Sequence, residues 1–87
     1  MNPKRVALLT GAAGGIGQPA ARELAGRGYA LALVDCDAAA LEALSQSLRD
    51  NGAQVLNYAG DLADLAFAER TVRETAREWG QIGRAHV

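Results

Sequence analysis

Apolar residues along the chain come in short runs that alternate with longer segments of helical periodicity. Two runs, at 6–9 and 30–34, are continuously apolar, and a weaker one spans 54–58. Continuous runs of this length are typical of strands that are buried on both faces of a parallel sheet. After each run, apolar residues recur every three or four positions, which predicts an amphipathic helix. The pattern therefore predicts three strands and three helices in strict alternation.

The three predicted helices have different apolar faces. These faces comprise Ile16, Ala20, Leu24 and Ala25 in the first helix (about 15–27), Leu41, Leu44 and Leu48 in the second, and Leu65, Val72, Ala76 and Trp79 in the third. Asp37 is expected to cap the second helix, and Trp79 to anchor the third in the core. A glycine follows each helix, at Gly28, Gly52 and Gly80, and glycine commonly ends helices in the left-handed conformation.

Successive strand and helix units of this kind assemble in one predominant way. Right-handed crossovers place the three strands in a parallel sheet of order 3-2-1, with helices on both faces. This three-layer α/β arrangement is one half of a doubly wound fold, whose second half normally covers the other edge of the first strand. We therefore expect residues 1–81 to form half of a nucleotide-binding domain with that edge exposed.

Charge and composition exclude several classes of partner. The net charge is −1 and Lys4 is the only lysine, so no basic cluster is present to attract nucleic acid or an anionic membrane. No apolar run approaches the roughly 18 residues of a membrane span, and the run that begins at Val6 is too short for a signal peptide. The single cysteine, Cys36, is expected to be a reduced, small apolar side chain with no metal-binding role. These features predict a cytoplasmic protein.

The strongest chemical signal is a glycine-rich turn between the first strand and the first helix. It comprises Thr10-Gly11-Ala12-Ala13-Gly14-Gly15-Ile16-Gly17. Glycines allow a sharp turn and a close approach to a pyrophosphate, while the N–H groups at the start of the helix face the phosphate oxygens. No Gly-Lys-Ser/Thr ending follows, which argues against a P-loop NTPase. The alternative is that these glycines only build a tight turn.

Asp35, at the end of the second strand, favours the binding interpretation. An acidic residue at this distance from the turn can accept hydrogen bonds from the hydroxyls of an adenosine ribose. The alternative is a helix cap beside Asp37. A 2′-phosphate would meet the carboxylate with a repulsion of about 4 kcal/mol per charge pair before solvent screening. No arginine or lysine occupies position 14 or 36, where it could bind a 2′-phosphate, so NAD is predicted in preference to NADP.

The Thr-Gly-x-x-x-Gly-x-Gly spacing of residues 10–17 resembles the signature of the short-chain dehydrogenases/reductases, and the resemblance covers 4 to about 81. It implies a Rossmann-type fold in which the pyrophosphate lies against Gly11, Gly15, Ile16 and Gly17, with Ile16 acting through its N–H. Thr10 would be structural. Asp61 and Leu62 match the family's Asp-aliphatic pair, which contacts the adenine; plain helix entry is their alternative role.

The family's Ser-Tyr-Lys chemistry has no counterpart in these 87 residues. The resemblance implies hydride transfer between a nicotinamide cofactor and an alcohol or carbonyl substrate, in a homo-oligomeric parent. There, a tyrosine four residues before a lysine acts as the general acid or base. In this sequence Tyr29 and Tyr58 are followed at that spacing by Leu33 and Leu62. We therefore predict no catalytic residue in the chain itself.

The last residues depart abruptly from the family pattern. Codons ATC GGA AGA GCA CAC GTC would encode residues 82–87, and that string resembles a common sequencing adapter. The hypothesis is that 82–87 are a non-native tail, that His86 is a frayed end without function, and that the chain is an N-terminal fragment. Two alternatives are a free-standing nucleotide-binding or regulatory module and an interaction protein that keeps the fold without the ligand.

Overall fold

A computed structural model describes residues 5–80 and 85–86. The elements, in chain order, are β1 (Val6–Thr10), α1 (Gly17–Gly26), β2 (Ala30–Asp35), α2 (Ala38–Asp50), β3 (Val55–Ala59), α3 (Leu65–Trp79) and β4 (Ala85–His86). The strands form one sheet in the order β3-β2-β1-β4, and every neighbouring pair is parallel. The predicted order of the first three strands, with three helices, is therefore confirmed.

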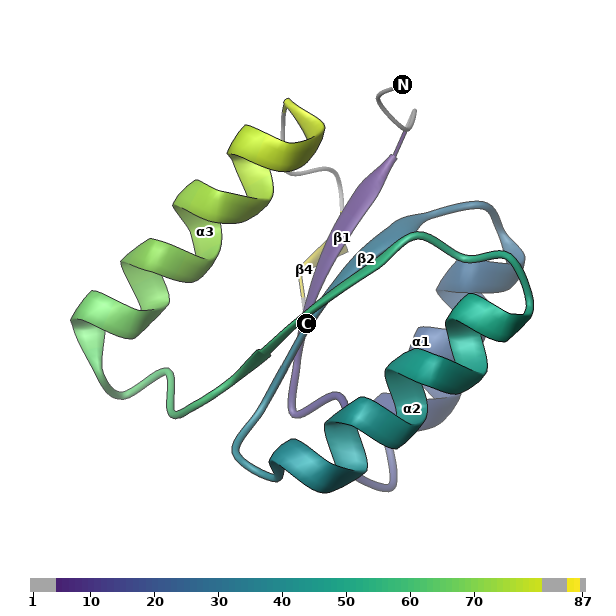
Figure 1. Ribbon diagram of the computed structural model, residues 1–87, viewed down its shortest axis with the longest axis horizontal. Coiled ribbons are helices and arrows are strands. Elements are labelled where there is room, and N and C mark those ends of the chain that lie inside the picture. The colour runs from purple at the N-terminus through teal and green to yellow at the C-terminus, as the bar shows by residue number, and fades with distance from the viewer. Residues whose placement is uncertain (1–4, 81–84, 87) are drawn as a thin grey trace.

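The sheet lies between two helical layers (Figure 1). Helices α1 and α2 cover one face, and α3 lies across the other. Successive side chains of a strand point to opposite faces, so β1 sends Ala7 and Leu9 toward α1 and α2, and Val6 and Leu8 toward α3. All four are nearly inaccessible to solvent. This explains why the strand is continuously apolar, as the sequence analysis predicted.

Several helices begin or end at residues whose types favour helix ends, as the sequence predicted. Asp37 caps α2, since its Oδ1 accepts a hydrogen bond from the N–H of Ala40 at 3.0 Å. The three glycines predicted to end the helices all have positive φ, including Gly80, the C-cap of α3. Pro19 is the third residue of α1. It therefore lies in the first turn, where its missing N–H breaks no intrahelical bond.

Two predicted helix faces are wrong in part. The side chain of Ile16 is 87% exposed, because α1 begins only at Gly17 and Ile16 precedes its first turn. In α3, Leu65 and Val72 are also exposed. The buried residues of α3 are instead Phe67, Thr71, Thr75 and Trp79.

Hydrogen bonds explain why threonines replace the predicted aliphatic residues on the inner face of α3. The Thr71 hydroxyl donates to the carbonyl of Phe67 at 2.9 Å, within the helix. The Thr75 hydroxyl donates to the Tyr58 hydroxyl on β3 at 3.4 Å. A buried hydroxyl with a partner carries little penalty, so these side chains occupy core positions that an apolar pattern does not identify.

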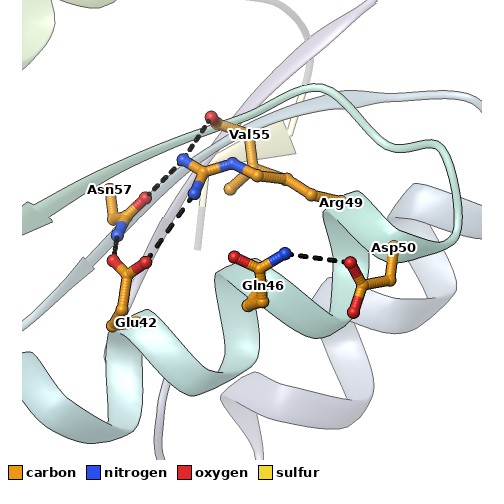
Figure 2. A network of polar contacts seen from close by, with 6 residues as sticks. All are labelled: Glu42, Gln46, Arg49, Asp50, Val55 and Asn57. Carbon is orange, nitrogen blue, oxygen red and sulfur yellow. Dashed lines mark hydrogen bonds and ion pairs between the residues drawn. The ribbon is translucent and has the colours of Figure 1, made fainter.

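A polar network ties α2 to β3, the strand at one edge of the sheet (Figure 2). Arg49 donates to the Val55 carbonyl and to Oδ1 of Asn57, both at 3.0 Å. The Asn57 amide donates in turn to Glu42 at 2.9 Å. These groups cover backbone that an edge strand otherwise leaves open to pairing with another chain.

At the opposite edge, the structure differs from the expectation of an uncovered β1. Ala85 pairs with Ala7 and His86 with Leu8, in the two-residue strand β4. His86 is therefore paired through its backbone and not frayed, because an edge strand offers N–H and C=O groups to any extended segment beside it. The other residues of the predicted tail, 82–84 and 87, lie outside the described residues. None of the helices in residues 5–80 has both the length and the hydrophobicity needed to cross a membrane.

Candidate functional site

Three turns meet at the carboxyl ends of β1, β2 and β3, where they surround an open cavity of about 250 Å³. Gly11 lines it from the first turn, Asp35 and Cys36 from the second, and Gly60 and Leu62 from the third. The carboxyl edge of an open parallel sheet is where α/β folds bind their ligands. The cavity is slightly smaller than those that hold drug-sized molecules, so a larger ligand would place only part of itself there.

The glycine turn after β1 is built by close backbone contacts. Gly11 has a φ of 63°, a conformation that favours glycine. At Gly17, a Cβ would overlap the Gly11 carbonyl oxygen and lie 2.8 Å from Cα of Ala12. The start of α1 therefore packs directly on the turn, and any side chain at Gly17 would force the two apart.

The turn leaves backbone donors at the start of α1. The N–H of Ala12 bonds to the Val34 carbonyl, and that of Gly14 to the Gly11 carbonyl, both at 3.1 Å. No hydrogen bond from the N–H groups of Gly15, Ile16 and Gly17 is found among residues 5–80. A helix N-terminus with unpaired donors attracts anions through these groups and through the helix dipole.

Gly15 differs from Gly17 in what surrounds it. A Cβ at Gly15 would meet no protein atom within 4 Å, and its φ is not positive. Neither backbone conformation nor internal packing therefore requires glycine at this position. The open space lies beside the unpaired donors, where a bound group would need it.

Asp35 joins all three turns. Its Oδ2 accepts from the N–H of Ala13 in the glycine turn, and its Oδ1 accepts from the N–H of Asp37, both at 2.9 Å. Its backbone carbonyl accepts from the N–H of Gly60 at 3.0 Å. The carboxylate thus points toward the glycine turn, and it also supports the chain before α2. The N-cap of that helix is Asp37, so Asp35 does not have the capping role that was its alternative.

The two residues predicted to contact the adenine lie differently. Leu62 lines the cavity and packs partly against the core on the α3 side of the sheet. Asp61 is exposed and does not line the cavity, and its Oδ1 accepts from the N–H of Ala63 at 2.8 Å. Its observed contact is that of a turn before a helix. The N-cap of α3 is Asp64, whose Oδ1 accepts from the N–H groups of Ala66 and Phe67.

Sequence reasoning missed the place of Cys36. Its thiol is exposed and lines the cavity beside Asp35, whereas a small apolar side chain was expected. The signal was available, because Asp35 was expected to end its strand, and the residue after the end of a parallel strand leaves the sheet at its carboxyl edge.

Neither tyrosine lies at this cavity. Tyr29 lines a separate hollow at the amino ends of the strands, with Gln54 and Gly52, and the guanidinium of Arg5 lies 5.8 Å from the centre of its ring. Tyr58 points toward α3, where it accepts from Thr75. Neither side chain therefore lines the cavity at the carboxyl ends of the strands, and the absence of a catalytic role for both stays a prediction.

Known proteins resemble this chain in sequence and in fold. The sequence model of the short chain dehydrogenase family matches residues 5–84. A CLA biosynthesis dehydrogenase/reductase of Lactiplantibacillus plantarum is 37% identical over 78 residues, which are 90% of this chain and 27% of that protein.

Two solved structures show the same fold with a dinucleotide bound. One is a short chain dehydrogenase/reductase of Burkholderia phymatum in complex with NAD, with a TM-score of 0.89 and 30% identity over 93% of this chain and 29% of that one. The other is an alcohol dehydrogenase of the archaeon Thermococcus sibiricus complexed with 5-hydroxy-NADP, with a TM-score of 0.85 and 32% identity over 93% of this chain and 35% of that one. The chain spans between 27% and 34% of the length of eight curated relatives that it matches.

Proposed function

The chain belongs to the short chain dehydrogenase family, and from that premise we propose that it binds the adenosine and diphosphate part of a nicotinamide dinucleotide. The ligand would lie across the carboxyl ends of β1, β2 and β3. The observation that carries the proposal is the space beside Gly15, next to three N–H groups at the start of α1.

The residues present fit this ligand in three respects. The N–H groups of Gly15, Ile16 and Gly17 suit diphosphate oxygens, since they add partial positive charge to hydrogen bonding. The carboxylate of Asp35 suits ribose hydroxyls, because each of its oxygens accepts one N–H and retains a further acceptor position. Leu62 gives the cavity an apolar wall for a flat base. Asp61, turned toward Ala63, has a weaker claim to the adenine.

NAD is the proposed cofactor in preference to NADP. A 2′-phosphate near Asp35 would place like charges together, and its neighbour Cys36 offers no cation in compensation. Because the related structures include both an NAD complex and an NADP-analogue complex, the choice depends on this chain's own residues.

The whole protein is proposed to be an oxidoreductase acting on an alcohol or carbonyl group. The cofactor, when bound, supplies the nicotinamide ring that accepts or donates the hydride. Within residues 5–80, the proposed role of the chain is to position the dinucleotide. Tyr29 and Tyr58 both lie away from the cavity, so neither is proposed to transfer a proton to the substrate.

Isothermal titration calorimetry with NAD, NADP and ADP tests the proposal directly. We expect NAD and ADP to bind with similar affinity, because the proposed contacts are with the ADP portion, and NADP to bind more weakly. A folded chain, shown by cooperative thermal unfolding, that binds none of the three would refute the proposal. A clear preference for NADP would refute only the assignment of the cofactor.

A further inference from the structure

The peptide of Ala13, in the middle of the glycine turn, is held by side chains. Its neighbours Ala12 and Gly14 donate to backbone carbonyls. The N–H of Ala13 donates instead to Oδ2 of Asp35 at 2.9 Å, and its carbonyl accepts from the Gln18 amide at 2.8 Å. The conformation of the turn at this point therefore depends on a residue 22 positions away in the sequence.

We propose that Asp35 is a positioning residue for the diphosphate site, in addition to any contact that it makes with a ribose. This inference depends on the proposed function, since it concerns the same ligand. Asp35 fixes the peptide group between Ala12 and Ala13 through its N–H, and Gln18 fixes the next one through its carbonyl. Together they set the direction of the chain into Gly14 and Gly15, which lead to the N–H groups at the start of α1 that have no acceptor among residues 5–80. Without the bond from Ala13 to Asp35, these N–H donors would adopt several orientations, and they would bind a diphosphate more weakly.

Electrostatics predicts opposite changes in ligand affinity for the positioning role and for ribose binding alone. A carboxylate near a diphosphate repels it, so removing the charge should strengthen the binding of any ligand that makes no ribose contact. If Asp35 orders the turn, removing it should weaken the binding of the same ligand. The two roles therefore predict opposite changes.

The experiment compares ADP with 2′,3′-dideoxy-ADP, which lacks both ribose hydroxyls, on the full 87-residue chain. The variants are Asp35→Ala, which removes both carboxylate bonds, and Asp35→Asn, whose single carbonyl oxygen can accept only one of the two N–H groups. The matched control is Asp37→Asn. It removes a charge two residues away and keeps an oxygen to cap α2 through the N–H of Ala40.

Calorimetry should show dideoxy-ADP binding about tenfold more weakly to Asp35→Ala than to the natural chain, as expected for the loss of a charge-assisted hydrogen bond. Asp35→Asn should show a smaller loss, and Asp37→Asn an unchanged or tighter binding. Hydrogen exchange supplies a readout that involves no ligand. The Ala13 amide should exchange faster in Asp35→Ala and at its natural rate in Asp37→Asn.

Each outcome has a distinct meaning. Unchanged or tighter dideoxy-ADP binding by Asp35→Ala, or unchanged exchange at Ala13, would overturn the positioning role while leaving the proposed function in place. Failure of the natural chain to bind ADP would refute the proposed function, and with it this inference. If Asp35→Ala does not unfold cooperatively, the comparison is made with Asp35→Asn and read together with the exchange of the Ala13 amide. Faster exchange with weaker dideoxy-ADP binding, or natural exchange with unchanged or tighter binding, supports the positioning role, and any other combination overturns it.

Discussion

Replacing Gly15 with alanine should separate binding from folding. A Cβ at Gly15 meets no protein atom within 4 Å, and its φ lies outside the left-handed region. The substitution therefore fits the folded chain, and the lower entropy of the unfolded state should stabilise the protein by about 0.4–1 kcal/mol. The added methyl group would, however, occupy the space through which a diphosphate approaches the N–H groups at the start of α1.

The expected loss of binding is large. Keeping the diphosphate away from two charge-assisted hydrogen bonds, each worth about 1.5–3 kcal/mol, should weaken NAD binding about a hundredfold or more. Calorimetry measures the dissociation constant, and thermal unfolding without ligand measures stability. We expect Gly15→Ala to unfold at or slightly above the natural temperature while losing most of its affinity.

Two further glycines serve as controls. Gly26, the last residue of α1, is also exposed with open space around its Cβ position, so Gly26→Ala should leave NAD binding unchanged. Gly17→Ala should destabilise the fold by at least 1–3 kcal/mol, because its Cβ would overlap backbone atoms of Gly11 and Ala12. If Gly15→Ala binds NAD as tightly as the natural chain, the diphosphate does not approach at Gly15 and the reasoning is wrong.

Three other measurements test separate parts of the account. Cys36 is the only cysteine, and its exposed thiol lines the cavity. NAD at about 100 times its dissociation constant should therefore slow alkylation of this thiol up to a hundredfold. An unchanged alkylation rate would place the ligand elsewhere. Asp64→Ala should cost about 1 kcal/mol in urea unfolding and Asp64→Asn much less, because asparagine also caps helices; equal losses would argue against a capping role. Arg49→Met should lower the free energy of unfolding by about 1 kcal/mol, because it removes the bonds to β3. Gln46→Ala on the same helix should change that free energy by less than about 0.5 kcal/mol. Similar values for both variants would show that the edge network contributes nothing.

Local signals in the sequence were sufficient for the strands and for the helix ends. The runs beginning at Val6 and Ala30 are buried on both faces, because each lies between two helical layers. Asp37 and the glycines that follow the helices act through their own backbone neighbourhood, which sequence spacing reveals. The orientation of α3 was not predictable from apolar periodicity, because Thr71 and Thr75 satisfy their hydroxyls inside the core and leave Leu65 and Val72 outside.

The candidate site, too, was predictable from the sequence only in part. The glycine turn and Asp35 could be assigned from their places after β1 and β2, because parallel strands bring their carboxyl ends to one edge. The bond between Asp35 and the Ala13 peptide depends on the tertiary placement of two turns, which spacing does not reveal. The same is true of Cys36 at the cavity and of Asp61 turned toward Ala63.

The most direct test of the central claim is a two-dimensional NMR titration of the ¹⁵N-labelled chain with NAD. The account predicts saturable shifts in the amide signals of Gly15, Ile16 and Gly17, with smaller shifts at Asp35 and Leu62 and none at Tyr29, at the opposite ends of the strands. Shifts centred on Tyr29 and its neighbours, or no saturable shift at the start of α1, would contradict it.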